Sequence, residues 1–416
     1  MSKAIQDFLD RHCLNTDAIS MDDLCSRFID AMHDGLSGKK SPLAMIGSYC
    51  FVGKSPEAGQ SVIVIDAGGT NLRSCLVTFK EDGTPEISRF RKTAMPGTLC
   101  EVTPAGFFGG LADSIEDLID LSDRIGFCFS YEAEITADHD GIPRRMSKEI
   151  KAPGILGKHL GKELLAELGR RGHDVSAKKV LVLNDTVATL LAAQAAPGAK
   201  SYDGYIGFIL GTGTNTAYIE KDGQIINVES GGMDFCPGDI DREFVSATAD
   251  PGKAWLEKMI SGAYLGPLAY KVIKAAEKEG LFSAAFTDAF ASAQNLRTSE
   301  LSAFLAEDPD CLLSRCASDD DDYDTLFEIL GAFTSRAAML TAANLASAVL
   351  VTDFGKDEDH PVLINADGTT FHRTAMLKNL VTEYLDAYLS EKGRRAVITA
   401  VDNSPVIGSA IGALSI

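Results

Sequence analysis

SVIVIDAGGTNLRSCLVTF, the stretch at residues 61–79, decides the fold of this 416-residue chain. An apolar run ends at Asp66, a Gly-Gly-Thr turn follows, and the residues from Leu72 to Phe79 are again mostly apolar. This pattern predicts two adjoining strands joined by a tight turn. Glycines without Cβ let backbone N–H groups approach phosphate oxygens, and an acid at a strand end can hold hydrated Mg²⁺. Taken alone, the turn only suggests a phosphate site.

The same order of elements returns in the second half of the chain. The run YIGFIL at 205–210 is followed by the turn GTG, the run NTAYIE at 215–220 and then QIINVES. Gly213-Thr214-Asn215 there matches Gly69-Thr70-Asn71 in the first stretch. An ordinary hairpin turn explains either triplet alone, but two in matching positions favour duplicated lobes. Such lobes would hold ATP in a cleft between the two turns.

The rest of the chain alternates between helical and strand-like patterns. Residues 1–46 carry apolar positions at helical spacing and predict two helices with a loop around 35–41. From residue 254 onward the pattern predicts mainly helix, closed by the elements RAVITAV and PVIGSAIGAL. Between the repeats we expect strands at 86–91, 124–130 and 179–184, and helices at 110–121, 157–170 and from 185 through 195.

Two other patterns resemble ligand-binding motifs. Residues 47–55, GSYCFVGKS, look like a phosphate-binding P-loop, but five residues rather than four separate the glycines. Pro56 and Gly59 follow at once, so no helix can direct its N–H groups at phosphates, and we reject this loop. The acidic run DDDDYD at 319–324 lacks the glycine and spacing of an EF-hand. We expect it to begin a helix, with a metal loop as the alternative.

Composition limits the partners of the chain. With 39 basic and 59 acidic residues the formal charge is −20, which repels nucleic acid and anionic membranes. The nine cysteines are odd in number and form no C-x-x-C pair, which fits a reducing cytosol, and we assign none of them a role. No signal peptide and no stretch of membrane-spanning length is evident. We expect two domains in a cytoplasmic protein that binds small molecules, with no nucleic acid or membrane partner.

Asn184 and Asp185 follow a buried apolar strand, at the end where open α/β sheets place their ligands. A carboxylate there can orient a sugar hydroxyl and accept its proton. Helix capping explains the same residues, because Asn-Asp-Thr precedes a segment rich in Ala and Leu. The residues alone leave both interpretations open.

Several segments in one order together resemble the hexokinase family, within the superfamily of actin-like ATPases and sugar kinases. They span about residues 60–415 and are 66–73, FCFS (127–130), MSKEIK (146–151), NDTVAT (184–189), 211–215, NVE (227–229), EKMISGAYLG (257–266) and GSA (408–410). The resemblance implies an α/β fold of two actin-like, ribonuclease H-like lobes, with mixed sheets flanked by helices and a cleft between them. A small lobe would take 59–184 and 403–416, and a large lobe 1–58 and 185–402.

The resemblance also implies a site. The residues matching the family's sugar-binding positions are Ser130, Ser147, Lys148, Asn184, Asp185, Asn215, Glu229 and Glu257. Those matching its ATP-binding positions are Asp66, Gly68, Gly69, Thr70, Asn71, Arg73, Thr212, Gly213, Gly408 and Ser409, with 367–369 flanking the adenosine. Asp185 and Lys148 would be catalytic, and Asp66 would hold Mg²⁺ through water. The implied reaction moves the γ-phosphoryl group of ATP to the 6-hydroxyl of a hexose.

The sequence departs from the family pattern around the sugar. Tyr131-Glu132 stands where the family has Phe-Pro, Glu149 replaces a glycine, and Ser230 replaces an aromatic residue. None of these changes removes a proposed catalytic group, but they leave the preferred hexose open among glucose, mannose and fructose. A sugar sensor with little catalysis and another actin-like ATPase are the alternative functions.

Overall fold

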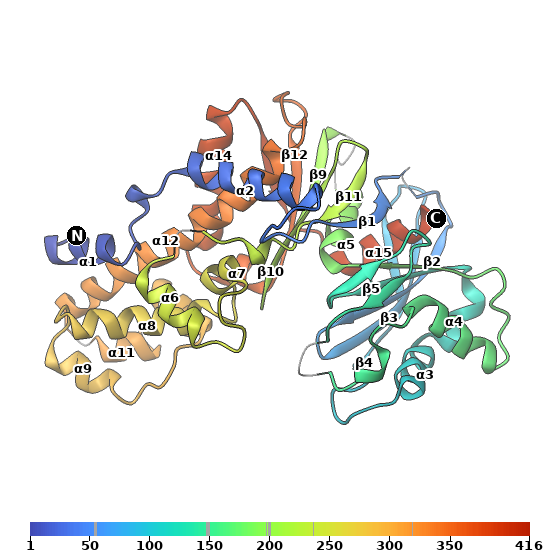
Figure 1. The fold of residues 1–416 in the computed structure, drawn as a ribbon, viewed down its shortest axis with the longest axis horizontal. Coiled ribbons are helices and arrows are strands. Elements are labelled where there is room, and N and C mark those ends of the chain that lie inside the picture. Colours follow the sequence, from blue (N-terminus) through green and yellow to red (C-terminus); the bar gives the residue numbers. More distant parts are fainter. Residues whose placement is uncertain (54–55, 147–149, 197, 199–200, 236, 318) are drawn as a thin grey trace.

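The computed structural model describes residues 1–416 except 54–55, 147–149, 197, 199–200, 236 and 318, and contains two lobes, each built on a β-sheet (Figure 1). The first sheet has the strand order β4-β3-β2-β5-β8, and the second has the order β1-β11-β10-β9-β12-β13. Helices cover both sheets, so the predicted α/β class with mixed sheets is confirmed. Assignment of the residues at 59, 184 and 403 as lobe limits stays a prediction.

Each of the two repeated stretches contributes the central strands of one sheet. Those of the first sheet are β2 (Ser61–Gly68), β3 (Asn71–Phe79), β4 (Pro85–Ala94), β5 (Arg124–Phe129) and β8 (Lys179–Leu183). Those of the second are β1 (Ile46–Phe51), β9 (Gly204–Leu210), β10 (Thr214–Ile219), β11 (Gln224–Asn227), β12 (Val362–Asp367) and β13 (Ala396–Thr399). A separate hairpin pairs β6 (Ala133–Ile135) with β7 (Gly141–Pro143).

The helices flank the sheets and fill the far end of the second lobe (Figure 1). They are α1 (Lys3–Arg11), α2 (Met21–Leu36), α3 (Pro104–Ile115), α4 (Leu160–Arg170), α5 (Asp185–Ala192), α6 (Asp239–Ser246), α7 (Trp255–Ile260), α8 (Leu265–Lys278), α9 (Ala284–Phe290), α10 (Thr298–Leu305), α11 (Leu312–Cys316), α12 (Asp320–Leu350), α13 (Thr369–Arg373), α14 (Leu377–Glu391) and α15 (Ser404–Leu414).

The two sheets repeat one arrangement. In the first, the antiparallel hairpin β2–β3 is extended by β5 parallel to β2 and by β8 parallel to β5. In the second, the hairpin β9–β10 is extended in the same way by β12 and β13. On the other side of each hairpin, β4 pairs antiparallel with β3 and β11 pairs antiparallel with β10, and the second sheet has β1 as a further strand beyond β11. This common order confirms the duplicated lobes that the sequence predicts.

Strands β1, β6, β7 and β12 lie where the sequence analysis placed no strand. Strand β12 falls in a region predicted to be mainly helical; its residues are all buried except Asp367, and a parallel strand buried on both faces shows no alternation to detect. Strand β1 occupies the start of the P-loop-like segment, and Gly47 pairs there with Ile226 of β11. Residues 54–55 of that segment lie outside the described residues, and its first half is a strand that the sequence analysis did not predict.

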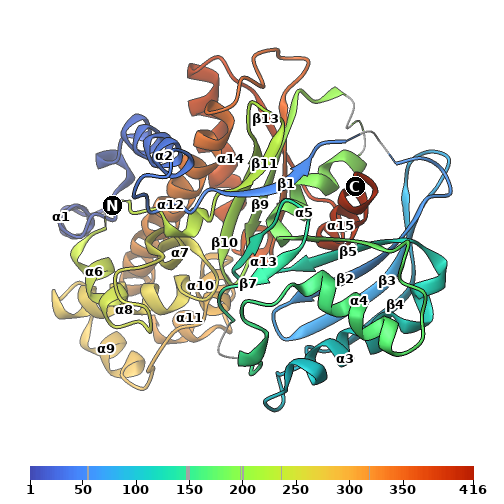
Figure 2. The same cartoon turned by 45° about the vertical axis from the view of Figure 1, so that its right-hand side comes forward.

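Helices α5 and α15 cross between the sheets (Figure 2). Helix α5 follows β8 of the first sheet but packs on β9 of the second, where a Cβ at Gly207 would lie 2.3 Å from the Thr186 carbonyl oxygen. Helix α15 follows β13 of the second sheet but packs on β5 of the first, with a Cβ at Gly126 lying 2.4 Å from the Ser409 oxygen. The helices also touch each other, because a Cβ at Gly408 would lie 1.7 Å from the Ala188 oxygen. Each sheet is therefore covered in part by a helix from the other repeat.

Helix α12 runs through the core of the second lobe. The acidic run forms its N-terminus, with the Asp319 side chain accepting a hydrogen bond from the Asp322 N–H at 2.8 Å, as the sequence predicted. Among the described residues, no group of three or more His, Cys, Asp or Glu side chains forms a metal site. The helix is long and apolar enough to cross a membrane by composition, but 72% of its most apolar window is buried in the protein. That burial is typical of a core helix.

Candidate active site

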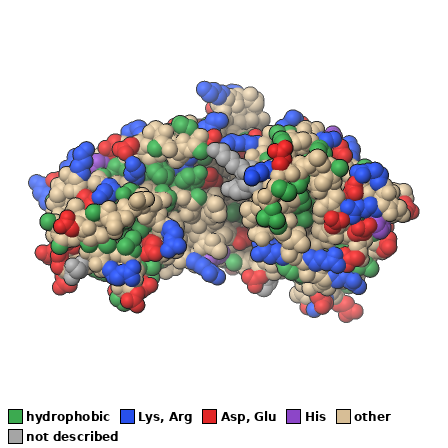
Figure 3. All heavy atoms as spheres, turned by 90° about the horizontal axis from the view of Figure 1, so that it is seen from below, with side chains coloured by type: hydrophobic (Ala, Val, Ile, Leu, Met, Phe, Trp, Pro, Cys, Tyr) green, Lys and Arg blue, Asp and Glu red, His purple; other side chains and the backbone are tan. Residues whose placement is uncertain are grey.

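A cavity of about 600 Å³ gathers the predicted sugar-binding residues from both lobes. Figure 3 shows a recess between the lobes. Ser130 follows β5, Asn184 and Asp185 follow β8, Asn215 lies on β10, Glu229 follows β11 and Glu257 lies on α7; all of these line the cavity. Ser147 and Lys148 lie outside the described residues, so their predicted roles stay predictions.

The amides and carboxylates on the second sheet hold one another in place. Asn215 Nδ2 donates to Asn227 Oδ1 at 2.7 Å and to Glu229 Oε1 at 3.2 Å. Asn227 Nδ2 donates to the same Glu229 oxygen at 2.8 Å. Glu229 itself adopts a left-handed backbone, with φ 57°. The sequence places Asn227 beside the site without assigning it a role, and the structure makes it the residue that orients Glu229.

Glu257 is held by the neighbouring Gly-rich turn. Its Oε2 accepts the N–H of Thr214 at 3.1 Å, and a Cβ at Gly213 would lie 2.5 Å from that oxygen. A glycine is needed at 213 because any side chain would displace the carboxylate. Burial raises the pKa of Glu257. Burial also raises the pKa of Glu229, and the negative charge of Asp185 adds to that effect.

The Asp185 side chain is not needed to cap α5, because the residue before it does so. Asn184 is the N-cap of α5, and its side chain accepts the N–H of Thr186 at 2.8 Å. The Asp185 carboxyl is half-buried and faces the cavity. Burial raises its pKa, hydrogen bonds from Ser130 and Thr186 oppose that effect, and the Asp66 carboxylate adds to it. A carboxylate with a raised pKa is a stronger base, which is the chemistry that proton abstraction from a hydroxyl requires.

The first Gly-rich turn lies near Asp185 but outside the cavity. Gly68 pairs with Asn71 across the hairpin, and Gly69 between them has φ 60°, which favours glycine. Asp66, which is 2% exposed, accepts a hydrogen bond from Arg73 Nη1 at 2.7 Å. Burial raises the Asp66 pKa, and the Arg73 pair opposes this rise. Arg73 engages one of the two Asp66 oxygens, and the predicted contact of Asp66 with Mg²⁺ through water stays a prediction.

The second Gly-rich turn stands between two cavities. Gly213 lines the cavity with Asp185, and Thr212 lines a second cavity of about 530 Å³. The second cavity is formed by Gly262, Ala263, Thr298, Ser299, Ser302, Ala303, Ala306, Thr369, Thr370, Arg373 and Thr374. Its wall includes Thr369 of the 367–369 segment predicted to flank the adenosine. The turn is fixed by Thr370, whose hydroxyl donates to the Gly211 carbonyl at 2.8 Å.

Eight of the ten predicted ATP-binding residues line neither cavity. Gly408 and Ser409 are buried in α15, where Gly408 permits the contact with α5 and the Ser409 hydroxyl donates to the Pro405 carbonyl at 2.6 Å. In this structure they serve helix packing. Asp66, Gly68, Gly69, Thr70, Asn71 and Arg73 also line neither cavity, although the charges of Asp66 and Asp185 act on each other.

The cavity contains charged residues that sequence reasoning missed. They are Arg145, Asp250, Lys253 and Lys258, joined by Tyr131 and Glu132, which the sequence analysis noted only as departures. The Tyr131 hydroxyl donates to the Gly69 carbonyl and so connects the sugar side to the first phosphate turn. Lys258 could have been noticed from its place directly after Glu257, whereas Arg145 and Asp250 lie in loops without a detectable pattern.

The duplicated lobes and the polar cavity between them define a protein of the actin-like sugar kinase fold. The chain belongs to the hexokinase family, because two family models described as hexokinase match residues 4–195 and 205–415. The structure of hexokinase from Schistosoma mansoni complexed with glucose is similar, with a TM-score of 0.77 and 23% identity over 100% of this chain and 99% of that one.

Curated relatives are similarly distant in sequence. Hexokinase-1 of Rattus norvegicus is 27% identical over 91% of this chain, but the match spans only 46% of that protein. Hexokinase-2 of Schizosaccharomyces pombe is 27% identical over 95% of this chain and 93% of its own length. The chain therefore spans about half the length of the first of these relatives and nearly all of the second.

Proposed function

We propose that this protein transfers the γ-phosphoryl group of ATP to the 6-hydroxyl of a hexose. The observation that carries the proposal is the single cavity in which Ser130, Asn184, Asp185, Asn215, Glu229 and Glu257 converge from both lobes. A site built to hydrogen-bond each hydroxyl rejects molecules that lack one, because its own polar groups are then left unpaired. Glucose is the first candidate, supported by the glucose complex of the Schistosoma mansoni hexokinase.

In the proposed mechanism, Asp185 accepts the proton of the 6-hydroxyl as the new O–P bond forms. The bond between the γ-phosphorus and the β,γ-bridging oxygen of ATP breaks in the same in-line displacement, and that oxygen leaves with ADP. The Thr212–Gly213 turn would hold the phosphates and the second cavity would hold the adenosine, a proposal supported by the position of this turn between the two cavities. Mg²⁺ bound with ATP would supply charge neutralisation, with Asp66 contacting it through water and Lys148 assisting. A cytoplasmic location completes the proposal.

A substrate panel tests this function against its alternatives. ADP release is measured with ATP and Mg²⁺, without sugar and with glucose, mannose, fructose or N-acetylglucosamine. We expect turnover that depends on a hexose. Turnover independent of sugar would favour an ATPase, and sugar binding without turnover would favour a sensor. Absence of turnover with every hexose would contradict the proposal.

A further inference from the structure

An ion pair crosses the hexose cavity from one lobe to the other. Arg145 Nη2 lies 3.1 Å from Asp250 Oδ2 and 3.3 Å from Asp250 Oδ1, and both residues line the cavity with Asp185. Arg145 follows β7, in the segment between β5 and β8 of the first sheet. Asp250 lies between α6 and α7, in the segment between β11 and β12 of the second sheet. The pair therefore ties together loops that belong to different sheets.

Each partner is anchored to a residue beside the sugar site. Lys258 Nζ donates to the Asp250 carbonyl at 2.6 Å, and Lys258 is 2% exposed and directly follows Glu257. Burial lowers the pKa of Lys258, while the charges of Asp250 and Glu257 oppose that change. On the other side, the Arg145 N–H donates to the Glu132 carbonyl at 3.3 Å, two residues from Ser130. Movement of either loop is thus linked to a proposed sugar-binding residue.

The pair suits a contact that forms and breaks. The side chains are 57% and 46% exposed, so neither is left buried and uncompensated when the lobes separate. An exposed pair of this kind changes an equilibrium constant by at most about fivefold. That is enough to adjust affinity without holding the lobes permanently shut.

We propose that Arg145 and Asp250 form a latch that closes over bound hexose and raises the affinity for it. The inference rests on the proposed function, since it deepens the account of the same cavity. These are positioning residues, and the chemistry at Asp185 does not need them. Hexose affinity should therefore depend on the latch, whereas kcat should not.

The test compares Arg145→Ala, Asp250→Ala, the double variant and the charge exchange R145D/D250R. Kd for glucose is read from the fluorescence of Trp255, the single tryptophan, whose Nε1 donates to the Gly252 carbonyl in the Asp250 loop at 3.1 Å. KM and kcat are measured in parallel. We expect each single variant to raise Kd and KM about three- to fivefold, the double variant to add little, and the exchange to restore part of the loss.

A matched control lies one residue away. Arg144→Ala breaks the pair with Glu134, which has similar exposure of 52% and 53% but stays within the β6–β7 hairpin. We expect no change in glucose affinity. Additive losses in the double variant, or an equal loss in Arg144→Ala, would overturn the latch. If the wild-type protein phosphorylates a hexose and Kd is unchanged in all variants, the latch alone is overturned. If the wild-type protein neither binds nor phosphorylates any hexose, the proposed function is overturned together with the latch.

Discussion

The neighbouring residues Asn184 and Asp185 differ in their contacts, because the first caps a helix and the second faces the cavity. Asn184 caps α5, and its neighbour is therefore free to present a carboxylate to the cavity. Burial and the nearby Asp66 charge raise the pKa of that carboxylate, while Ser130 and Thr186 restrain the rise. The structure confirms helix capping for Asn184, and the catalytic interpretation stays a proposal for Asp185.

Replacing Asp185 tests its proposed role directly. Asp185→Asn keeps the shape of the side chain but cannot accept the hydroxyl proton. Because general-base assistance contributes roughly 10²–10⁴-fold, we expect kcat to fall by that order while Kd for glucose, read from Trp255 fluorescence, changes much less. Asn184→Ala is the informative companion, since it should destabilise α5. A near-normal kcat in Asp185→Asn would exclude Asp185 as the base.

Ser130 should set the acid limb of the pH profile. Asp185 works as a base only when ionised, so kcat/KM falls as the pH drops through its pKa, which lies above the usual carboxyl value. Ser130→Ala removes a hydrogen bond to the ionised form and should move this limb to higher pH. The measurement is kcat/KM against pH for both proteins. An unmoved limb would mean that another group controls it.

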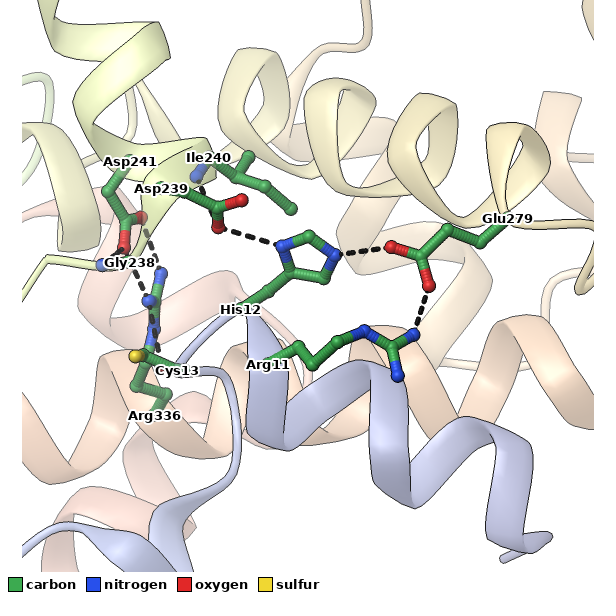
Figure 4. A network of polar contacts seen from close by, with 9 residues as sticks. All are labelled: Arg11, His12, Cys13, Gly238, Asp239, Ile240, Asp241, Glu279 and Arg336. Carbon is green, nitrogen blue, oxygen red and sulfur yellow. Dashed lines mark hydrogen bonds and ion pairs between the residues drawn. The ribbon is translucent and has the colours of Figure 1, made fainter.

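At the scale of elements, a histidine directly after the N-terminal helix makes polar contacts with two helices of the second lobe (Figure 4). His12 Nδ1 lies 2.7 Å from Asp239 of α6, and Nε2 lies 2.7 Å from Glu279 at the end of α8. Both partners are carboxylates, and a neutral imidazole can donate to only one of them. Arg11, which also pairs with Glu279, and the buried Arg336–Asp241 pair are the other charges nearby. The geometry thus requires the imidazolium form.

The stability of the folded protein should depend on whether His12 is protonated. Burial lowers the His12 pKa, but the hydrogen bonds and charges of Asp239 and Glu279 outweigh it, so the net pKa is raised. The stabilisation is then fully present below about pH 6.5 and is lost as the pH rises through the higher folded-state pKa. We expect His12→Gln to lower the thermal unfolding midpoint more at pH 6 than at pH 9.

A surface histidine provides the comparison for this effect. His360 pairs with Asp357, and both side chains are more than half exposed, so His360→Gln should change the unfolding midpoint little at either pH. An equal effect of the two replacements, or a loss in His12→Gln that does not depend on pH, would contradict the charged link.

The sequence predicted those elements whose turn residues and paired strands are close together in the chain. The β2–β3 and β9–β10 hairpins each carry their own turn residues, and their apolar runs are adjacent in the chain. Strand β12 has neither signal, because its parallel neighbours β9 and β13 are distant in sequence and it is buried on both faces. The contact of Gly408 with α5 could not be predicted either, because Ala188 is distant in sequence, and the ATP-binding role of Gly408 stays a prediction. Arg145 and Asp250 meet only through the tertiary fold.

For the whole molecule, two lobes around one cavity imply a closing movement. Closure around sugar excludes water, which would otherwise compete as the acceptor of the phosphoryl group. The chain should therefore become more compact when a phosphorylatable hexose binds. Small-angle scattering with and without saturating glucose measures this change, and the Arg145→Ala variant should require more glucose to reach it. An unchanged scattering curve at saturation would count against closure.

The crossing of α5 and α15 also has a consequence for biosynthesis. The core beside β2 and β8 is completed by Val406, Ile407, Ala410 and Ile411 of α15, which the ribosome adds long after β8. At about 5–20 residues per second, the interval between synthesis of β8 and α15 is roughly 10–50 s. During that interval the nascent first half exposes the apolar face that α15 helps to cover in the folded protein. Newly made chains should therefore depend on chaperones until α15 emerges, and a chain truncated before Ser404 should aggregate.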